Sequence, residues 1–160
     1  FNIPNLTDKE TDYFFSQAHI NDRKRYPKIL HKKGDKFNRV FNFLLNGTYM
    51  QPHLHPGFQK KEKMYVVYGS FYLIFFNKKG KVEKKILLDH KINNYYEVPP
   101  FKWHTYIVRS KKAIVYETMI GRYKPETWKK MASWAPKEIF KNAENYLMNL
   151  KLSIIKNKNA

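Results

Sequence analysis

Residues 47–55, Gly-Thr-Tyr-Met-Gln-Pro-His-Leu-His, carry the pattern that decides the expected fold and chemistry of this chain. Side chains of an extended strand alternate between two faces, so His53 and His55 are expected to point the same way. Two imidazoles side by side form half of a metal site. Glu62 and His104, further along the chain, offer a carboxylate and a third imidazole. Three nitrogens and one oxygen suit Zn, Fe(II), Mn or Ni.

Short apolar and aromatic runs, separated by turn residues, follow one another on both sides of this stretch. They predict seven or eight strands, at residues 38–46, 48–55, 63–68, 71–76, 81–88, 95–98, 103–109 and 113–120. No helical pattern interrupts them. We therefore expect a mainly β sandwich or small barrel.

Helical patterns flank the predicted strands. Thr7 and Glu10 form a capping box that predicts a helix over residues 8–19. Its apolar face would carry Tyr13, Phe14 and Ala18. The expected parts of the single structural domain are an N-terminal helix and lead-in segment (1–37), a β-barrel (38–120) and a C-terminal helical segment (121–160).

The C-terminal segment changes from a strand period to helical spacing. Residues 125–132 predict a short helical turn, and Pro136 suits the first position of a final helix over residues 137–155. The apolar positions expected on that helix are Ile139, Phe140, Ala143, Tyr146, Leu147, Leu150 and Ile154.

The bulk composition limits the classes of partner. The 160 residues carry a formal net charge of +18 and no cysteine, which excludes disulfides, thiolate ligands and a cysteine nucleophile. Such a charge is typical of proteins with anionic partners. No nucleic-acid-binding motif is present, however, and the lysine pairs fall mostly at turns and strand ends. The sequence shows no signal peptide and no apolar run long enough to span a bilayer, so we expect a cytoplasmic protein without a membrane span. We also expect that it does not bind nucleic acid.

The spacing of these residues resembles the paired motifs of the cupin superfamily, G-x5-H-x-H-x(3,4)-E-x6-G and P-x-G-x2-H. The first motif is present as Gly47, His53, His55, Glu62 and Gly69, and the second as residues 99–104, Pro-Pro-Phe-Lys-Trp-His. Residues 48–56, 98–104, 121–125 and 134–138 are also similar to the cupin-fold metalloproteins of the WbuC family. That resemblance implies a cupin-type double-stranded β-helix (jelly-roll) barrel with an N-terminal helix and C-terminal helices. Genes of the WbuC family often lie with lipopolysaccharide O-antigen genes.

The chain departs from the superfamily motifs at two positions. Six residues separate His55 from Glu62, where the pattern has three or four, so residues 56–61 are expected to loop out. Phe101 replaces the glycine of the second motif. Because a glycine there permits a positive φ, we expect a remodelled turn before His104.

The resemblance implies that His53, His55, Glu62 and His104 ligate one divalent metal ion (Zn, Fe(II), Mn or Ni). Strand alternation suggests further cavity residues: Tyr49 and Gln51 would share the face of His53, and Tyr106 that of His104. Glu117 would face the barrel if its strand runs in register. Glu117 and Tyr49 are the candidate catalytic residues, and Gln51, Tyr106, Arg39 and Arg25 are the candidates for substrate binding. The alternative for each is an ordinary structural role in packing or in a salt bridge.

The function expected from these residues and this resemblance is that of a metal-dependent cupin enzyme. Its substrate would be a small carbohydrate or nucleotide sugar, and its reaction an isomerisation or epimerisation with the metal as Lewis acid. A homodimer is expected, because exposed strand edges need cover. The alternatives are an Fe(II)-dependent dioxygenase, a non-enzymatic sugar- or effector-binding module, and a basic protein whose surface binds nucleic acid or anionic lipid.

Overall fold

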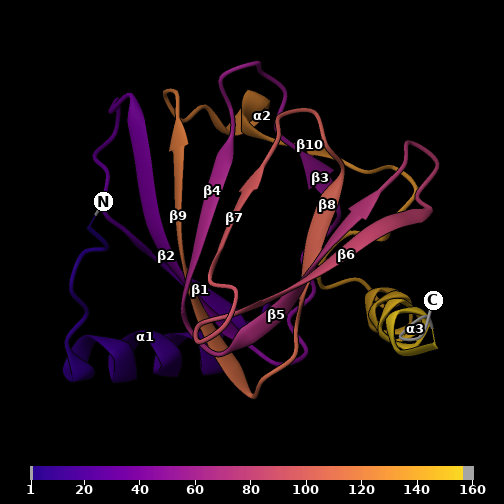
Figure 1. The fold of residues 1–160 in the computed structure, drawn as a ribbon, viewed down its shortest axis with the longest axis horizontal. Helices are drawn as coiled ribbons and strands as arrows, with labels where there is room; N and C mark the ends of the chain where they lie inside the picture. The colour runs from indigo at the N-terminus through magenta and orange to yellow at the C-terminus, as the bar shows by residue number, and fades with distance from the viewer. Residues whose placement is uncertain (1, 157–160) are drawn as a thin grey trace.

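The computed structural model describes residues 2–156 as two five-stranded antiparallel sheets that face each other (Figure 1). The first sheet has the order β1 (Arg25–Ile29), β2 (Phe37–Leu45), β9 (Lys112–Ile120), β4 (Glu62–Tyr68) and β7 (Tyr95–Val98). The second has the order β10 (Lys130–Met131), β3 (His53–Leu54), β8 (His104–Val108), β5 (Ser70–Phe76) and β6 (Val82–Asp89). This arrangement confirms the expected mainly β jelly-roll architecture. Residue 1 and residues 157–160 of the expected terminal segments lie outside the described range.

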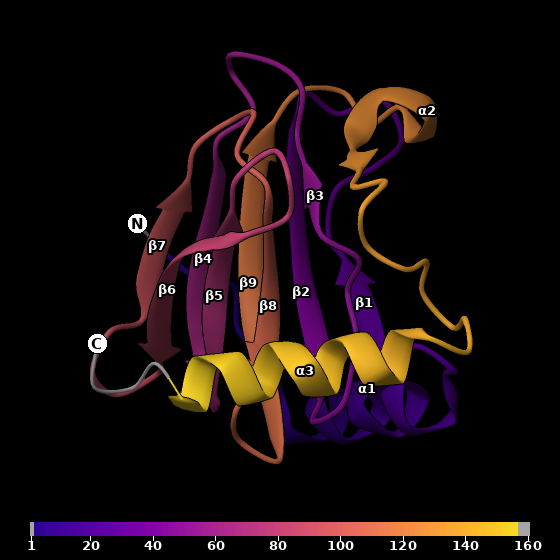
Figure 2. The ribbon, with the colours of Figure 1, turned by 90° about the vertical axis from the view of Figure 1, so that its right-hand side faces the viewer.

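Helices cover the outer faces of the two sheets. Helix α1 (Asp8–Ile20) packs on β1 and β2, and α3 (Ala143–Lys156) crosses the outside of the second sheet (Figure 2). The short helix α2 (Pro125–Trp128) lies at one end of the barrel, near the loop between β3 and β4 (Figure 1). In the part of the chain that is described, no helix is both long enough and apolar enough to cross a bilayer.

The sequence of β5 shows why the strands do not alternate between apolar and polar residues. Leu73 faces the space between the sheets, whereas Ile74 faces outward, yet both are fully buried. The outward cluster forms because Leu147 of α3 packs against it. On the first sheet, Phe15 of α1 and Phe43 of β2 form the equivalent outer cluster. Each sheet is therefore buried on both faces, which favours continuous apolar runs.

The N-terminal helix forms where its capping box predicts. The Thr7 hydroxyl accepts a hydrogen bond from the Glu10 backbone N–H at 3.1 Å, and the Glu10 carboxylate accepts one from the Thr7 N–H at 3.0 Å. The expectation that Tyr13 lies on the buried face is wrong, because its side chain is 54% exposed. Phe15 and Ala18 are the buried residues of this helix.

Two expected elements are shorter in the structure than their sequence patterns predict. The strand predicted over residues 48–55 is reduced to β3, because Pro52 has no N–H to donate to a sheet ladder. The final helix begins at Ala143 instead of residue 137. Ile139 has a φ of 69° and is exposed, so the helical spacing of the preceding residues does not produce a helix. Strands β1 and β10 were not predicted at all.

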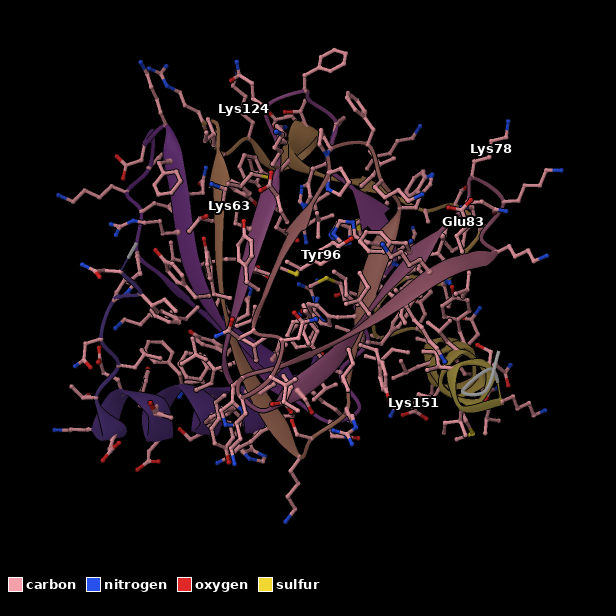
Figure 3. The ribbon with its side chains drawn as sticks, viewed as in Figure 1. Lys63, Lys78, Glu83, Tyr96, Lys124 and Lys151 are labelled. Atoms are coloured by element: carbon pink, nitrogen blue, oxygen red, sulfur yellow. The ribbon has the colours of Figure 1, made fainter. Side chains whose placement is uncertain are left out.

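The positive charge is spread around the molecule. Of the lysines that Figure 3 labels, Lys78 lies in the turn between β5 and β6, Lys124 beside α2, and Lys151 on α3. These three side chains lie on different sides of the barrel (Figure 3). Such a distribution is typical of solvated charges at turns and strand ends.

Candidate metal centre

Three histidines from the two central motifs meet inside the barrel. His53 of β3 lies directly opposite His104 of β8 in the antiparallel register, and their ring centroids are 4.5 Å apart. His55 follows β3 immediately, with its ring centroid 5.2 Å from that of His53. All three rings are buried, and their candidate ligand nitrogens lie within 4.8 Å of one another. The structure thus brings together the three histidines of the expected ligand set and forms a group that could hold a metal ion.

Backbone carbonyl groups orient all three rings in the same way. Each Nδ1 atom lies within hydrogen-bond distance of a carbonyl: Gln51 O at 3.0 Å from His53, Trp128 O at 2.9 Å from His55, and Lys102 O at 2.8 Å from His104. A carbonyl oxygen can only accept, so each Nδ1 carries the proton and donates it. In the neutral ring the Nε2 atom then presents a lone pair, which is the arrangement that metal-binding histidines adopt.

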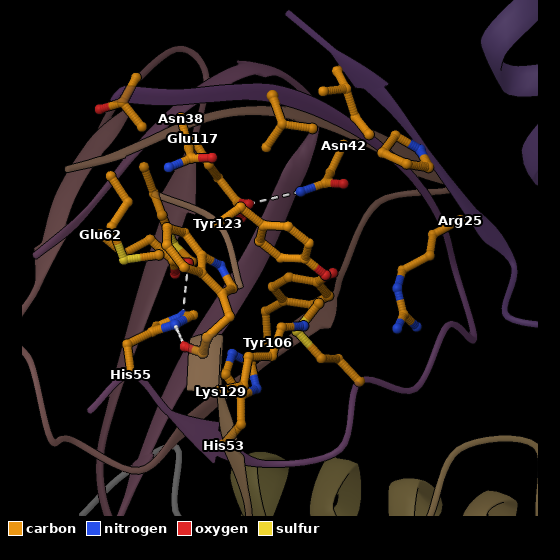
Figure 4. A pocket seen from close by; sticks show the side chains of 18 of the residues that line it. Arg25, Asn38, Asn42, His53, His55, Glu62, Tyr106, Glu117, Tyr123 and Lys129 are labelled. Carbon is orange, nitrogen blue, oxygen red and sulfur yellow. Dashed lines mark hydrogen bonds and ion pairs between the residues drawn. The ribbon is translucent and has the colours of Figure 1, made fainter. Parts of the chain in front are cut away.

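Glu62, the first residue of β4, completes the cluster. Its Oε2 atom lies 3.2 Å from Nε2 of His55, and its Oε1 atom lies 3.4 Å from Nε2 of His104. Burial raises the pKa of the Glu62 carboxyl, but His104 and His55 outweigh burial and hold the pKa well below 4.5. Glu62 is therefore an anion beside the imidazoles (Figure 4).

Two atoms of this cluster test whether a metal ion fits. Oε1 of Glu62 and Nε2 of His104 are buried and have no hydrogen-bond partner. Buried polar atoms are rarely left without a partner, because each costs about 1–3 kcal/mol. A divalent cation among three Nε2 lone pairs and a carboxylate would satisfy both atoms. Burial, followed by electrostatic interactions with His104 and Lys129, also lowers the pKa of His53 well below 6.5 and favours its neutral, ligating form.

The turn before His104 keeps the conformation that a glycine would adopt. Phe101 has a φ of 61°, which is uncommon for a side chain with a Cβ atom. Its N–H donates a hydrogen bond to the carbonyl oxygen of His55 at 3.0 Å, and its ring packs edge-on against Phe58 at 5.2 Å. The expected remodelling of this turn is therefore wrong. The hydrogen bond joins the two metal motifs directly and supports the strained backbone.

The inserted residues 56–61 form a loop over the end of the barrel, as expected. Lys60 extends from this loop across the Trp128 ring, with Nζ 5.0 Å from the ring centroid. The same Nζ atom donates a hydrogen bond to the carbonyl oxygen of Thr127 at 3.1 Å. The insertion therefore contacts α2 and contributes to the rim beside the histidines.

A cavity of about 460 Å³ opens beside the cluster, between the two sheets. His53, His55 and Glu62 form part of its wall (Figure 4). His104 lines it as well. Its other lining residues include Asn38, Asn42, Glu117, Tyr123, Trp128 and Lys129. The wall beside the candidate metal centre thus combines amide, carboxyl and ammonium groups with aromatic rings.

Glu117 lies on the cavity wall, as the expected strand register required. In β9 it is paired with Val40 of β2 and with Met64 of β4. Asn42 donates a hydrogen bond from Nδ2 to Oε2 of Glu117 at 2.7 Å (Figure 4). Burial, reinforced by the negative charge of Glu62, raises the pKa of Glu117 well above 4.5. A carboxyl group of this kind holds its proton to a higher pH than an ordinary glutamate, as a general acid requires.

The raised pKa of Glu117 predicts the direction of a pH effect on stability. The folded state holds this proton at pH values where the unfolded chain, with a pKa near 4.5, has lost it. The proton's contribution to stability is therefore complete below 4.5 and is lost as the pH rises through the folded-state pKa. Because glutamine mimics the protonated group, we expect the melting temperature of Glu117→Gln to rise relative to that of the native chain as the pH increases from 4.5 towards the folded-state pKa of Glu117. Thermal melts of metal-free samples test this; a difference that shrinks with rising pH would contradict it.

Of the other predicted catalytic and substrate-binding residues, Tyr106 lies on the cavity wall, whereas Tyr49 and Gln51 do not. Tyr106 lines the cavity, and its hydroxyl is buried without a hydrogen-bond partner; burial raises its pKa. The Tyr49 hydroxyl instead donates a hydrogen bond to Pro136 O at 2.7 Å, and Tyr49 packs beneath α3. Gln51 donates from Nε2 to Ala132 O at 3.0 Å. Neither Tyr49 nor Gln51 is among the cavity-lining residues, because the strand alternation that linked them to His53 ends at β3.

The two predicted anion-binding arginines also differ in position. Arg25 lines the cavity, but its NH2 atom lies 2.6 Å from Oε1 of Glu138, and its NH1 atom donates to the carbonyl oxygen of Tyr49 at 3.0 Å. Arg39 alternates with the inward residues of β2 and is not among the cavity-lining residues. The structure therefore places Arg25 in a salt bridge and Arg39 away from the candidate centre.

Asn42 and Lys129 line the cavity but were not predicted from the sequence. Asn42 shares the inward face of β2 with Leu44, two residues later, so strand alternation alone could have found it. Lys129 follows α2 and precedes a two-residue strand, a context without a periodic signal.

A family model and several solved structures are similar to this chain. Residues 6–88, more than half of the chain, match the model described as Domain of unknown function (DUF6016). No curated protein sequence matches the chain. The structural neighbours include the capsular polysaccharide assembling protein CapF from Staphylococcus aureus, with 17% identity over 70% of this chain and 32% of CapF, and a TM-score of 0.58.

Two further neighbours have the same fold. KdgF from Halomonas sp. is 18% identical over 67% of this chain and 86% of its own, with a TM-score of 0.52. Oxalate decarboxylase from Lactobacillus farciminis, in a formate complex, is 14% identical over 66% of this chain and 30% of its own, with a TM-score of 0.52. The chain thus spans about a third of CapF and of oxalate decarboxylase. These neighbours are cupin-fold proteins, and the barrel described above is a cupin barrel.

Proposed function

The chain belongs to the family of the Domain of unknown function (DUF6016), and we propose that it is a metal-dependent cupin enzyme acting on a small carbohydrate or nucleotide sugar. The observation that carries this proposal is the convergence of three buried Nε2 atoms and the Glu62 carboxylate on the wall of a cavity. Three histidines and one carboxylate leave coordination positions open for water or a ligand. When bound, a divalent metal would supply a Lewis acid that polarises a carbonyl or hydroxyl oxygen.

The cavity is suited to a polyhydroxylated ligand. Its volume of about 460 Å³ lies in the range of small-molecule sites. The Asn38 and Asn42 amides can donate to and accept from hydroxyl groups, while the rings of Tyr123 and Trp128, 5.3 Å apart, offer apolar surface. The resemblance to the WbuC family makes a sugar used in O-antigen biosynthesis the first substrate that we propose to test.

Glu117 supports isomerisation or epimerisation as the reaction class. Both reactions require a group that removes a proton from the substrate and returns it. The raised pKa of Glu117 suits this exchange, and the hydrogen bond from Asn42 orients the carboxyl group at the cavity wall. We assign Glu117 the role of acid and base; a metal held by His53, His55, Glu62 and His104 would supply the Lewis acid for the substrate oxygen.

Glu117→Gln is expected to lower turnover by about 10²–10⁴-fold, because glutamine keeps the shape and the Asn42 contact but cannot exchange the proton. The metal-loaded protein is incubated in D₂O with free sugars and nucleotide sugars. Deuterium incorporated at carbon is then measured by NMR. The matched control is Glu97→Gln, since Glu97 is exposed on β7 and pairs loosely with Lys61 at 3.8 Å.

Two outcomes of this experiment contradict the proposed reaction. Equal exchange rates in the native chain and in the Glu117→Gln variant would exclude Glu117 as the acid and base. Sugar binding by the metal-loaded protein without any exchange would favour a ligand-binding module over an enzyme.

A further inference from the structure

Lys129 is a cationic residue of the cavity wall. Lys129 lines the cavity, and within residues 2–156 no hydrogen bond or ion pair engages its ammonium group. Its side chain is accessible to solvent, so a ligand that enters the cavity can reach it. In Figure 4, Lys129 lies beside His53, whereas Asn42 and Glu117 lie on the opposite wall.

The backbone on both sides of Lys129 is held by the strand that carries the histidines. The Trp128 carbonyl accepts the hydrogen bond from Nδ1 of His55. Lys130 pairs with Leu54 in the β10–β3 ladder. The same short contacts therefore orient the candidate metal ligands and fix the position from which the Lys129 side chain extends.

The other cationic side chains of the wall are already paired. Arg25 and Arg23 both contact Oε1 of Glu138, at 2.6 Å and 3.3 Å. Arg25 also donates to the Tyr49 carbonyl, so its guanidinium is fixed by the protein itself. Among the residues that the structure describes, Lys129 is consequently the cation of this wall that remains available to an anionic ligand.

The electrostatics of the cavity also favour an anion. Partial desolvation at the cavity wall and the positive charge of Arg25 lower the pKa of Lys129, while Glu62 and Glu138 oppose that shift. An anionic ligand beside this ammonium group would stabilise its charge. A divalent cation at the centre would offset the charge of Glu62, and Glu117 holds its proton to a higher pH than usual. With such a cation bound, the cavity would present a more positive potential to its ligand.

We propose that Lys129 binds the carboxylate or phosphate group of an acidic sugar or sugar phosphate whose hydroxyl groups reach the metal centre. The inference rests on the proposed function, because it names the substrate class of the same site. This proposal assigns anion binding to Lys129, which was not predicted from the sequence, in place of the predicted Arg25 and Arg39.

The test compares three matched ligands on metal-loaded protein: neutral D-glucose, D-glucuronate and D-glucose 6-phosphate, titrated at constant ionic strength. We expect the native chain to bind at least one of the anionic sugars about tenfold more tightly than glucose, as expected for one charge-assisted hydrogen bond. Lys129→Met should abolish this preference without changing metal content or melting temperature. Lys130→Met, the adjacent exposed lysine of β10, should retain it. Glucuronate and glucose 6-phosphate separate a carboxylate site from a phosphate site.

Each other outcome overturns the inference. These outcomes are an equal affinity of the native chain for all three sugars, a preference that persists in Lys129→Met, and a preference that Lys130→Met loses equally. Metal content, measured in the same samples, separates this failure from that of the proposed function. Native protein that binds no metal contradicts the proposed function, whereas metal-loaded protein without anion preference contradicts only the role of Lys129.

Discussion

His104→Ala is expected to weaken metal binding by more than about 100-fold, so that the purified protein no longer carries a stoichiometric ion. Loss of a supporting hydrogen bond alone costs up to about 100-fold in metal affinity, and loss of a ligand should cost more. His104 is fully buried opposite His53, and its Nε2 atom faces the Glu62 carboxylate at 3.4 Å. Elemental analysis of protein reconstituted with Zn, Fe(II), Mn or Ni measures the effect.

The matched control for this variant is His19→Ala. His19 is exposed at the end of α1 and lies outside the candidate centre. Its replacement should leave metal content unchanged. A melting temperature recorded for both variants shows whether the buried cavity left by His104→Ala has unfolded the barrel. A folded His104→Ala protein that retains one equivalent of metal would remove His104 from the ligand set.

Gly69→Ala is expected to destabilise the fold by more than about 3 kcal/mol, as expected when backbone strain and a steric clash combine. Gly69 joins β4 to β5 with a φ of 75°. A Cβ atom there would lie 2.3 Å from the backbone oxygen of Lys112 and 2.6 Å from Oγ of Ser110. The backbone oxygen belongs to β9 and cannot rotate away, so the turn itself would have to move. Urea unfolding measures the change.

Gly34→Ala separates the clash from the backbone strain. Gly34 has a φ of 90°, but no atom lies within 4 Å of the position that its Cβ would occupy. We expect a loss of only about 1 kcal/mol, the usual cost of a left-handed conformation in a residue with a Cβ. Equal losses in the two variants would show that the close approach of β9 to Gly69 has no energetic consequence.

The strands were predictable where local chemistry and tertiary packing agree. Predicted and observed bounds differ by at most one residue for β2, β4, β5, β6, β7, β8 and β9, because their apolar runs end in turn residues. The meeting of His53, His55 and His104 was also foreseeable, since strand alternation and motif spacing lead to the same point. Glu117 depended on a register that only the pairing of β9 with β2 and β4 establishes.

The rest depended on contacts between distant parts of the chain. Tyr49 left the expected face because Pro52 interrupts the strand and the Tyr49 hydroxyl bonds to Pro136. The final helix begins late because Ile139 has a φ of 69°, next to Glu138, which pairs with Arg23 and Arg25. Lys129 reaches the cavity through the pairing of β10 with β3, a strand too short to leave a pattern in the sequence. Local propensity cannot report such interactions.

Anomalous diffraction, recorded at the absorption edge of the reconstituted metal, tests the central claim most directly. A single strong peak is expected at about 2.0–2.1 Å from Nε2 of His53, His55 and His104, as for a metal bound by imidazoles. Crystals of protein carrying one equivalent of metal but showing no peak among these three atoms would contradict the account.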